Sequence, residues 1–188
     1  MTVGEGRASL FPAERSAFWK RRSRRAFFRS IPSDAKVLEI GPGFRPCMVG
    51  PGVKYLDILD ARALAEGATA FNKDASRVPR IDYVSSAGDL SIVDERFEFV
   101  ISSHCIEHQP DLIRHLREVE RLLEPGGCYA LVIPDRRFCF DHYLRDSAVE
   151  DVVQAFREQR KVHTFNSVVE HRALTIRRRS AAANFLPF

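Results

Sequence analysis

The stretch KVLEIGPG, residues 36–43, decides the fold of this chain. Its first part has the apolar, β-rich composition of a buried parallel strand, and it runs directly into Gly41-Pro42-Gly43. Glycine has no Cβ, so a ligand can lie against the main chain at such a turn, at the carboxyl edge of a parallel sheet. The stretch therefore predicts an α/β fold whose ligand-binding edge lies at Gly41 and Gly43.

The acidic Glu39 narrows the choice of ligand. A dinucleotide fingerprint has a third glycine three residues after the second, where this chain has Pro46. A carboxylate beside the turn would also repel a pyrophosphate, whereas it can pair with a cationic or hydroxyl-rich ligand such as S-adenosylmethionine. Asp57 ends the next predicted strand, 53–57, where a carboxylate can accept hydrogen bonds from ribose hydroxyls, with Asp60 as the local alternative.

Four blocks of sequence together resemble one family. They are VLEIGPG (37–43), VKYLD (53–57), FEFVISSHCIEH (97–108) and LLEPGGCYALVIPD (122–135). Their order and spacing resemble a class I S-adenosylmethionine-dependent methyltransferase of the small-molecule type. The resemblance implies an α/β, three-layer αβα Rossmann-like methyltransferase sheet that is mostly parallel. In this chain we expect the final antiparallel hairpin of that fold to be reduced or absent.

The resemblance also assigns further cofactor contacts. Related enzymes carry an Asp after the third strand that meets the adenine amine, and alignment places Ser86 at that position. We therefore expect Ser86 or Asp89 to substitute for it. Ser103 and His104, at the end of the predicted fourth strand, are expected over the cofactor.

The loop after the fifth strand, 134–143, is expected to face the methyl acceptor, because open parallel sheets bind ligands at strand carboxyl ends. Methyl transfer from a sulfonium depends mainly on positioning, and an oxygen acceptor benefits from a base within hydrogen-bond reach. His104, Asp135 and His142 are the candidate catalytic residues. For each of them a structural role remains the alternative.

The run His104-Cys105-Ile106-Glu107-His108 also matches the HxxEH pattern of inverted zinc peptidases. That pattern needs a helix to place both histidines on one face, whereas here a strand precedes it and Gln109-Pro110 closes it. We therefore expect no metal site, and we expect His108 to be a hydrogen-bonded structural residue.

Length and composition fit one domain with extensions. The chain has 188 residues, 45% of them hydrophobic. We expect a basic N-terminal helical arm (1–30), an S-adenosylmethionine-binding core (31–146), and a C-terminal helix with a basic tail (147–188). The net charge of +4 comes from the two ends. A solvated helix face, an anionic substrate, a membrane surface and nucleic acid all remain explanations of the basic arm.

The four cysteines form no CxxC pair, which favours structural thiols in a reducing compartment. The N-terminus does not resemble a signal peptide, and no stretch approaches about 18 apolar residues. We expect a cytoplasmic protein without a membrane span.

Several functions fit these patterns. The favoured one is a methyltransferase that acts on a small-molecule or carbohydrate-like acceptor. The alternative is a methyltransferase-like binding or regulatory module with weak or no catalysis. A nucleic-acid methyltransferase or binder ranks below both because no NPPY-like base-flipping motif is present, and a nicotinamide oxidoreductase ranks last.

The last edge of the sheet is expected to be incomplete. Residues 161–188 offer only VHTFNSVV and RALTIR as weak strand candidates, which predicts five main strands. An exposed edge seldom stays unpaired. We expect the C-terminal segment, the aromatic N-terminal helix or a second copy of the chain to cover it, so a homodimer is one expected partner state.

Overall fold

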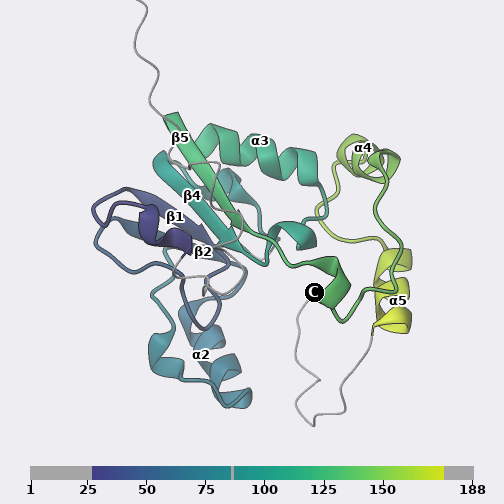
Figure 1. Cartoon of the computed structure of the whole chain (residues 1–188), viewed down its shortest axis with the longest axis horizontal. Helices are drawn as coiled ribbons and strands as arrows, with labels where there is room; N and C mark the ends of the chain where they lie inside the picture. Colours follow the sequence, from purple (N-terminus) through teal and green to yellow (C-terminus); the bar gives the residue numbers. More distant parts are fainter. Residues whose placement is uncertain (1–26, 86, 176–188) are drawn as a thin grey trace, which may run out of the picture.

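A five-stranded parallel sheet forms the centre of the computed structural model, which describes residues 27–85 and 87–175 (Figure 1). The strand order is β3-β2-β1-β4-β5, and every neighbouring pair is parallel. The strands are β1 (Val37–Ile40), β2 (Val53–Asp57), β3 (Tyr83–Val84), β4 (Phe97–Ser103) and β5 (Leu123–Val132). The α-helices of this part of the chain are α2 (Ala61–Ala70), α3 (Leu112–Leu122), α4 (Val149–Arg157) and α5 (Phe165–Leu174).

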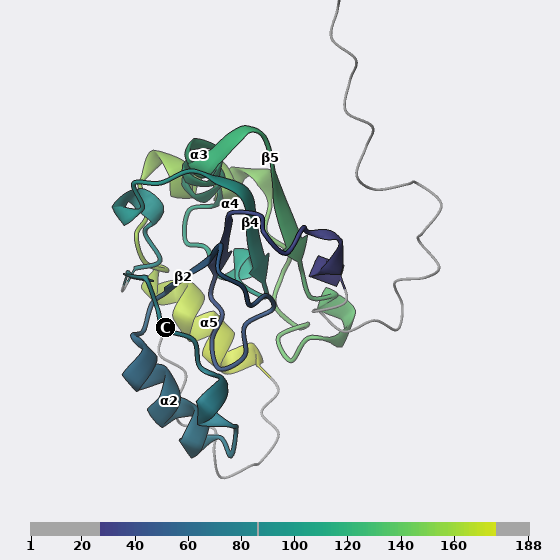
Figure 2. The same cartoon turned by 90° about the vertical axis from the view of Figure 1, so that its left-hand side faces the viewer.

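This architecture confirms the predicted Rossmann-like sheet, and no antiparallel strand occurs within the described ranges. In both views α3 lies at the top of the molecule and α2 at the bottom (Figures 1 and 2). None of the helices between residues 27 and 175 that the structure describes is both long and apolar enough to cross a bilayer.

Helix α3 covers one face of the sheet. Its Val119 and Leu122 belong to a buried cluster with alternate residues of the central strands, among them Leu38 and Val100. Alternation along a strand sends neighbouring side chains to opposite faces, so a strand buried on both faces has to be apolar throughout. This explains the continuous apolar runs from which the central strands were predicted.

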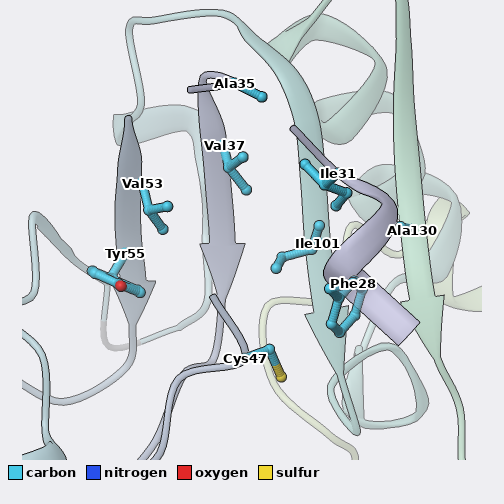
Figure 3. Close-up of a cluster of buried hydrophobic side chains, with 9 residues drawn as sticks. All are labelled: Phe28, Ile31, Ala35, Val37, Cys47, Val53, Tyr55, Ile101 and Ala130. Carbon is cyan, nitrogen blue, oxygen red and sulfur yellow. The ribbon is translucent and has the colours of Figure 1, made fainter. Parts of the chain in front are cut away.

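The segment that precedes β1 covers the other face. Phe28 and Ile31 lie in one buried cluster with Ile101 of β4 and Ala130 of β5 (Figure 3). Phe28 belongs to a 3-10 turn, Phe28–Ser30, at the end of the predicted N-terminal helical arm (1–30). Residues 1–26 lie outside the described part of the chain. The aromatic end of the arm therefore packs on a sheet face.

A set of hydrogen-bonded polar side chains connects β5 to α3 inside the core. His115 Nε2 lies 2.9 Å from the Tyr129 hydroxyl, which lies 3.1 Å from Ser102 Oγ. Burial lowers the pKa of His115 to about 4 and raises the pKa of Tyr129 to about 12. Both side chains are therefore uncharged at neutral pH.

Proline is common at the first position of a helix, which predicts helix starts at Pro46 and at Pro110. The structure differs at both positions. Residues 46–50 form no helix, and the N-cap of α3 is Asp111, which accepts from the Arg114 N–H at 2.9 Å.

No strand forms between residues 161 and 175, in agreement with the expected five main strands, and residues 176–177 of the second weak strand candidate lie outside the described part of the chain. Residues 165–174 form α5, a helix without any buried residue.

The position of Phe28 yields a stability prediction. Phe28 is 1% exposed, so Phe28→Ala should lower the free energy of unfolding by about 3–5 kcal/mol through lost burial and a cavity. Phe138 is 85% exposed, and Phe138→Ala should change it by no more than about 0.5 kcal/mol. Urea unfolding of the two variants measures the difference, and equal effects would contradict the packing of Phe28.

Candidate functional site

The glycine turn at the end of β1 has two glycines with different surroundings. Gly41 has φ +67° and Gly43 has φ +54°, both in the left-handed region that favours glycine. A Cβ built on Gly41 would lie 2.4 Å from Cys105 Sγ, whereas one built on Gly43 would meet no atom within 4 Å. Gly41 is thus needed for internal packing, and only Gly43 opens onto free space where a ligand can approach.

Cys105 fills the space that Gly41 leaves. Its Sγ donates weakly to the carbonyls of Ile40 (3.4 Å) and Ser103 (3.5 Å). Burial raises the pKa of the thiol to about 12, so it stays protonated. The contact joins two segments about 65 residues apart, and the sequence reasoning did not identify it.

Glu39 lies inside the core and holds the loop that follows the turn. It is 2% exposed, and its carboxylate accepts from the Cys47 N–H at 2.7 Å and the Met48 N–H at 3.1 Å. Charge-assisted bonds of this kind are short and strong. These two hydrogen bonds give Glu39 a role in holding the loop, and its contact with a cofactor stays a prediction.

Asp57 lies at the end of β2, beside the glycine turn. It is 7% exposed and accepts from the N–H groups of Gly43 (3.1 Å) and Leu59 (3.2 Å). Burial raises the pKa of Asp57 despite these bonds. Asp60, the rival for the same role, caps α2 by accepting from the Ala63 N–H at 2.7 Å. The structure therefore places Asp57, and not Asp60, against the turn.

Of the two residues expected to contact adenine, Asp89 lies in the described part of the chain. Ser86 lies outside the described residues. Asp89 accepts from the Ser91 N–H at 2.9 Å and from Arg114 at 2.5 Å, and these contacts lower its pKa to about 2. The Asp89 carboxylate is thus engaged with α3.

The end of β4 brings Ser103 and His104 to the same edge as the glycine turn. Ser103 is buried, while His104 is exposed and has φ +59°, a conformation that a non-glycine residue seldom adopts. The His104 N–H donates to the Val132 carbonyl at 2.9 Å. Its Nδ1 lies 3.7 Å from the Glu107 carboxylate, which also lies 3.9 Å from His108. Backbone strain of this kind often marks a functional position.

The loop after β5 holds the other two candidate catalytic residues. Asp135 is paired with the Arg137 guanidinium at 2.6 Å, and this pairing lowers the pKa of Asp135 to about 2. His142 Nδ1 lies 2.8 Å from the Cys139 carbonyl, which can only accept, so Nδ1 carries the proton. Nε2 of the neutral ring is therefore an acceptor.

Helix α5 and the segment that leads into it make two contacts near this loop that sequence reasoning missed. His163 Nε2 lies 3.0 Å from the His108 carbonyl, and the rings of His171 and Phe140 meet edge-on at 6.1 Å. No hydrophobic periodicity could have signalled them, because α5 buries no residue. Over residues 27–85 and 87–175, no three His, Cys, Asp or Glu side chains are grouped to hold a metal ion.

Comparison with known families identifies the chain. A family model described as a methyltransferase domain matches residues 11–185. The chain belongs to this methyltransferase-domain family, as the four sequence blocks predicted.

Solved structures similar to this methyltransferase domain match it over part of its length. The glycopeptide N-methyltransferase MtfA complexed with sinefungin is 27% identical, with a TM-score of 0.41, and the match covers 57% of this chain and 51% of MtfA. The CcbJ methyltransferase from Streptomyces caelestis is 21% identical, with a TM-score of 0.38 and coverage of 57% and 49%. The [4+2]-cyclase SpnF is 17% identical, with a TM-score of 0.41 and coverage of 68% and 52%. The domain thus spans about half the length of these proteins.

The raised pKa of Asp57 predicts how stability depends on pH. The folded protein binds the Asp57 proton more tightly than the unfolded chain, so this group loses its stabilising effect as pH rises above about 4, the usual pKa of an Asp side chain. We expect Asp57→Asn to become relatively more stable than the wild type over this range, measured by urea unfolding. Asp89, with a lowered pKa, should show the opposite sign below about pH 4. The same sign for both would contradict the burial of Asp57.

Proposed function

We propose that this protein is an S-adenosylmethionine-dependent methyltransferase that acts on a small-molecule or carbohydrate-like acceptor by direct in-line transfer. One observation carries the proposal. At the shared edge of β1 and β2, Gly43 opens onto free space while its N–H is held by the buried Asp57 carboxylate. Free space beside a buried hydrogen-bond acceptor, at the carboxyl end of parallel strands, suits a nucleoside cofactor. Membership of the methyltransferase-domain family supports it.

The residues of this edge fit such a cofactor. Gly43 leaves room for its main body, and Asp57 offers the remaining acceptor capacity of a carboxylate to two ribose hydroxyls. Ser103 and His104 border the same edge from β4. Glu39 and Gly41 contribute indirectly. Glu39 holds the loop after the turn, and Gly41 leaves space for the side chain of Cys105. The cofactor supplies an activated methyl group on a sulfonium, which needs no covalent nucleophile on the protein.

His104 is the candidate general base that the geometry favours. It follows β4 directly, next to the Cys105 that packs on the glycine turn, and Glu107 lies on the Nδ1 side of its ring. In the neutral ring a proton on Nδ1 would leave Nε2 to take the acceptor proton. Asp135 is a poorer base because its pKa is lowered to about 2, and His142 remains the second candidate through its Nε2.

The exposed aromatic side chains of the loop after β5 support an acceptor with flat apolar faces. Phe138, Phe140 and Tyr143 are 85%, 50% and 65% exposed, and Asp141 and His142 lie among them in the sequence. Aromatic faces with neighbouring hydrogen-bonding groups suit the stacking of sugar rings and similar small molecules. Carbohydrate-like acceptors are therefore the first class to test.

A binding module with weak or no catalysis is the second candidate. The engagement of Asp89 with Arg114 favours it, because an adenine amine would have to share a carboxylate that is already paired with a guanidinium at 2.5 Å. Without a contact between Asp89 and the adenine amine, the affinity for the cofactor would be weaker, but the rest of the site would remain. Isothermal titration with S-adenosylmethionine measures binding, and a methyl-transfer assay with an S-adenosylhomocysteine readout measures catalysis. An active enzyme gives both signals, whereas a binding module gives the first without the second.

Cofactor binding should depend on Asp57 and not on Asp60. Asp57→Ala should weaken S-adenosylmethionine binding by about 1–3 kcal/mol, roughly 5- to 150-fold in Kd, because a buried acceptor is lost. Asp60→Ala is the matched control, since that side chain caps α2 and should leave Kd unchanged. Isothermal titration measures both. An effect confined to Asp60→Ala would move the ribose contact to that residue.

Catalysis should depend on His104. After a screen of carbohydrate-like acceptors with an S-adenosylhomocysteine readout, His104→Ala should lower kcat by about 100- to 10,000-fold, the range for loss of a general base. Asp135→Ala should change kcat by less than about tenfold, because Arg137 already holds that carboxylate. If His142→Ala alone abolishes transfer, the base is His142.

A further inference from the structure

The outer side of β5 is an unpaired edge of the sheet. On its inner side β5 pairs with β4 in the regular register Phe99↔Cys128 to Ser103↔Val132. Among residues 27–85 and 87–175, no strand pairs with the other side of β5. The edge next to the candidate site is therefore open in this part of the chain.

The direction of the backbone groups along β5 follows from one hydrogen bond. The Val132 carbonyl accepts from the His104 N–H, so Val132 turns its backbone groups towards β4. These groups alternate along a strand. Tyr129, Leu131 and the following residue Ile133 therefore turn their N–H and C=O groups outward. A row of such groups is a template for another strand.

The open part of the edge has no charged residue and no proline, two features that commonly protect edge strands from pairing. It comprises residues 128–133, CYALVI, and Ile133 is 57% exposed. Pro125 and Pro134 lie on either side and cannot donate a ladder bond, so they limit the segment that can pair. The open edge is thus short, apolar and sharply bounded.

An apolar groove accompanies the edge on the α3 side. It has a volume of about 430 Å³, and its apolar lining includes Leu116, Val119, Leu123 and Tyr129. The side chain of Tyr129 packs against the cluster on the α3 face of the sheet. By strand alternation Leu131 projects to this same face. A strand added to the edge would bring its own side chains towards this groove.

We propose that a second copy of this chain pairs with β5 to form a two-fold symmetric dimer with a continuous ten-stranded sheet. The outward residues Tyr129, Leu131 and Ile133 are symmetric about Leu131, so two antiparallel copies satisfy each other's groups. Leu131 pairs with Leu131 of the second copy, and Tyr129 pairs with Ile133 of the second copy. An isologous interface of this kind requires such self-complementarity. Because the two β5 strands run antiparallel, the carboxyl ends of the two sheets, and with them the two candidate sites, lie at opposite ends of the joined sheet.

Light scattering and amide exchange test this dimer on the full chain. Across about 5 to 200 µM protein, the mass should rise from the monomer value of 21.4 kDa towards twice that value. Exchange of the Tyr129 and Leu131 amides should slow about tenfold over the same range, while the Ala130 and Val132 amides, which face β4, should be protected throughout. If the protein is a monomer at every concentration, the proposal is overturned, even where another segment of the same chain protects the edge amides.

A pair of variants separates backbone pairing from side-chain loss. Leu131→Pro removes an outward N–H that β4 does not use, so the monomer should fold and dimerisation should weaken about tenfold or more. Leu131→Ala loses a similar side chain but keeps that N–H, and it should still dimerise. Circular dichroism reports folding, and if the proline variant unfolds, amide exchange in the wild type decides. An oligomer that persists in folded Leu131→Pro overturns the proposal.

Discussion

A carboxylate buried within the sheet, that of Glu39, supports the segment after β1. Residues 46–50, which follow the glycine turn, form no helix, so the N–H groups of this segment need partners outside it. Glu39 accepts from the N–H groups of Cys47 and Met48. A buried charge is tolerated only when it is hydrogen-bonded, so loop and carboxylate depend on each other. The shape of the ligand edge follows from this pair.

The central fold was predictable because its signals are apolar runs that the core requires. The strands around Leu38, Leu56 and Val100 are buried on both faces, and helix α3 repeats apolar residues at helical spacing. Helix α5 was not predictable for the same physical reason. Phe165 and Val169 are 81% and 49% exposed, so no core imposed a pattern on the residues between them.

The positions of the candidate site residues were predictable where these residues lie at strand ends. They were unpredictable where the residues contact segments that are distant in the sequence. Asp57 lies at the end of β2 and meets Gly43, as the position of both at strand carboxyl ends predicted. The contact of Cys105 with Gly41 and the pairing of Asp89 with Arg114 depend on three-dimensional approach of distant segments. Residue type and spacing contain no signal for them, so sequence reasoning treated Gly41 and Asp89 as open to ligand.

The packing of Cys105 gives this protein an intrinsic chemical reporter. Thiol reagents attack the thiolate, and a buried thiol whose pKa is raised to about 12 presents almost none of it at neutral pH. Alkylation of Cys105 therefore requires that the end of β4 first separate from Gly41. The rate of its modification measures how often the ligand edge opens, without any label or substrate. A molecule that rests on this edge would slow that rate, so cysteine protection can reveal occupancy before a methyl acceptor is known.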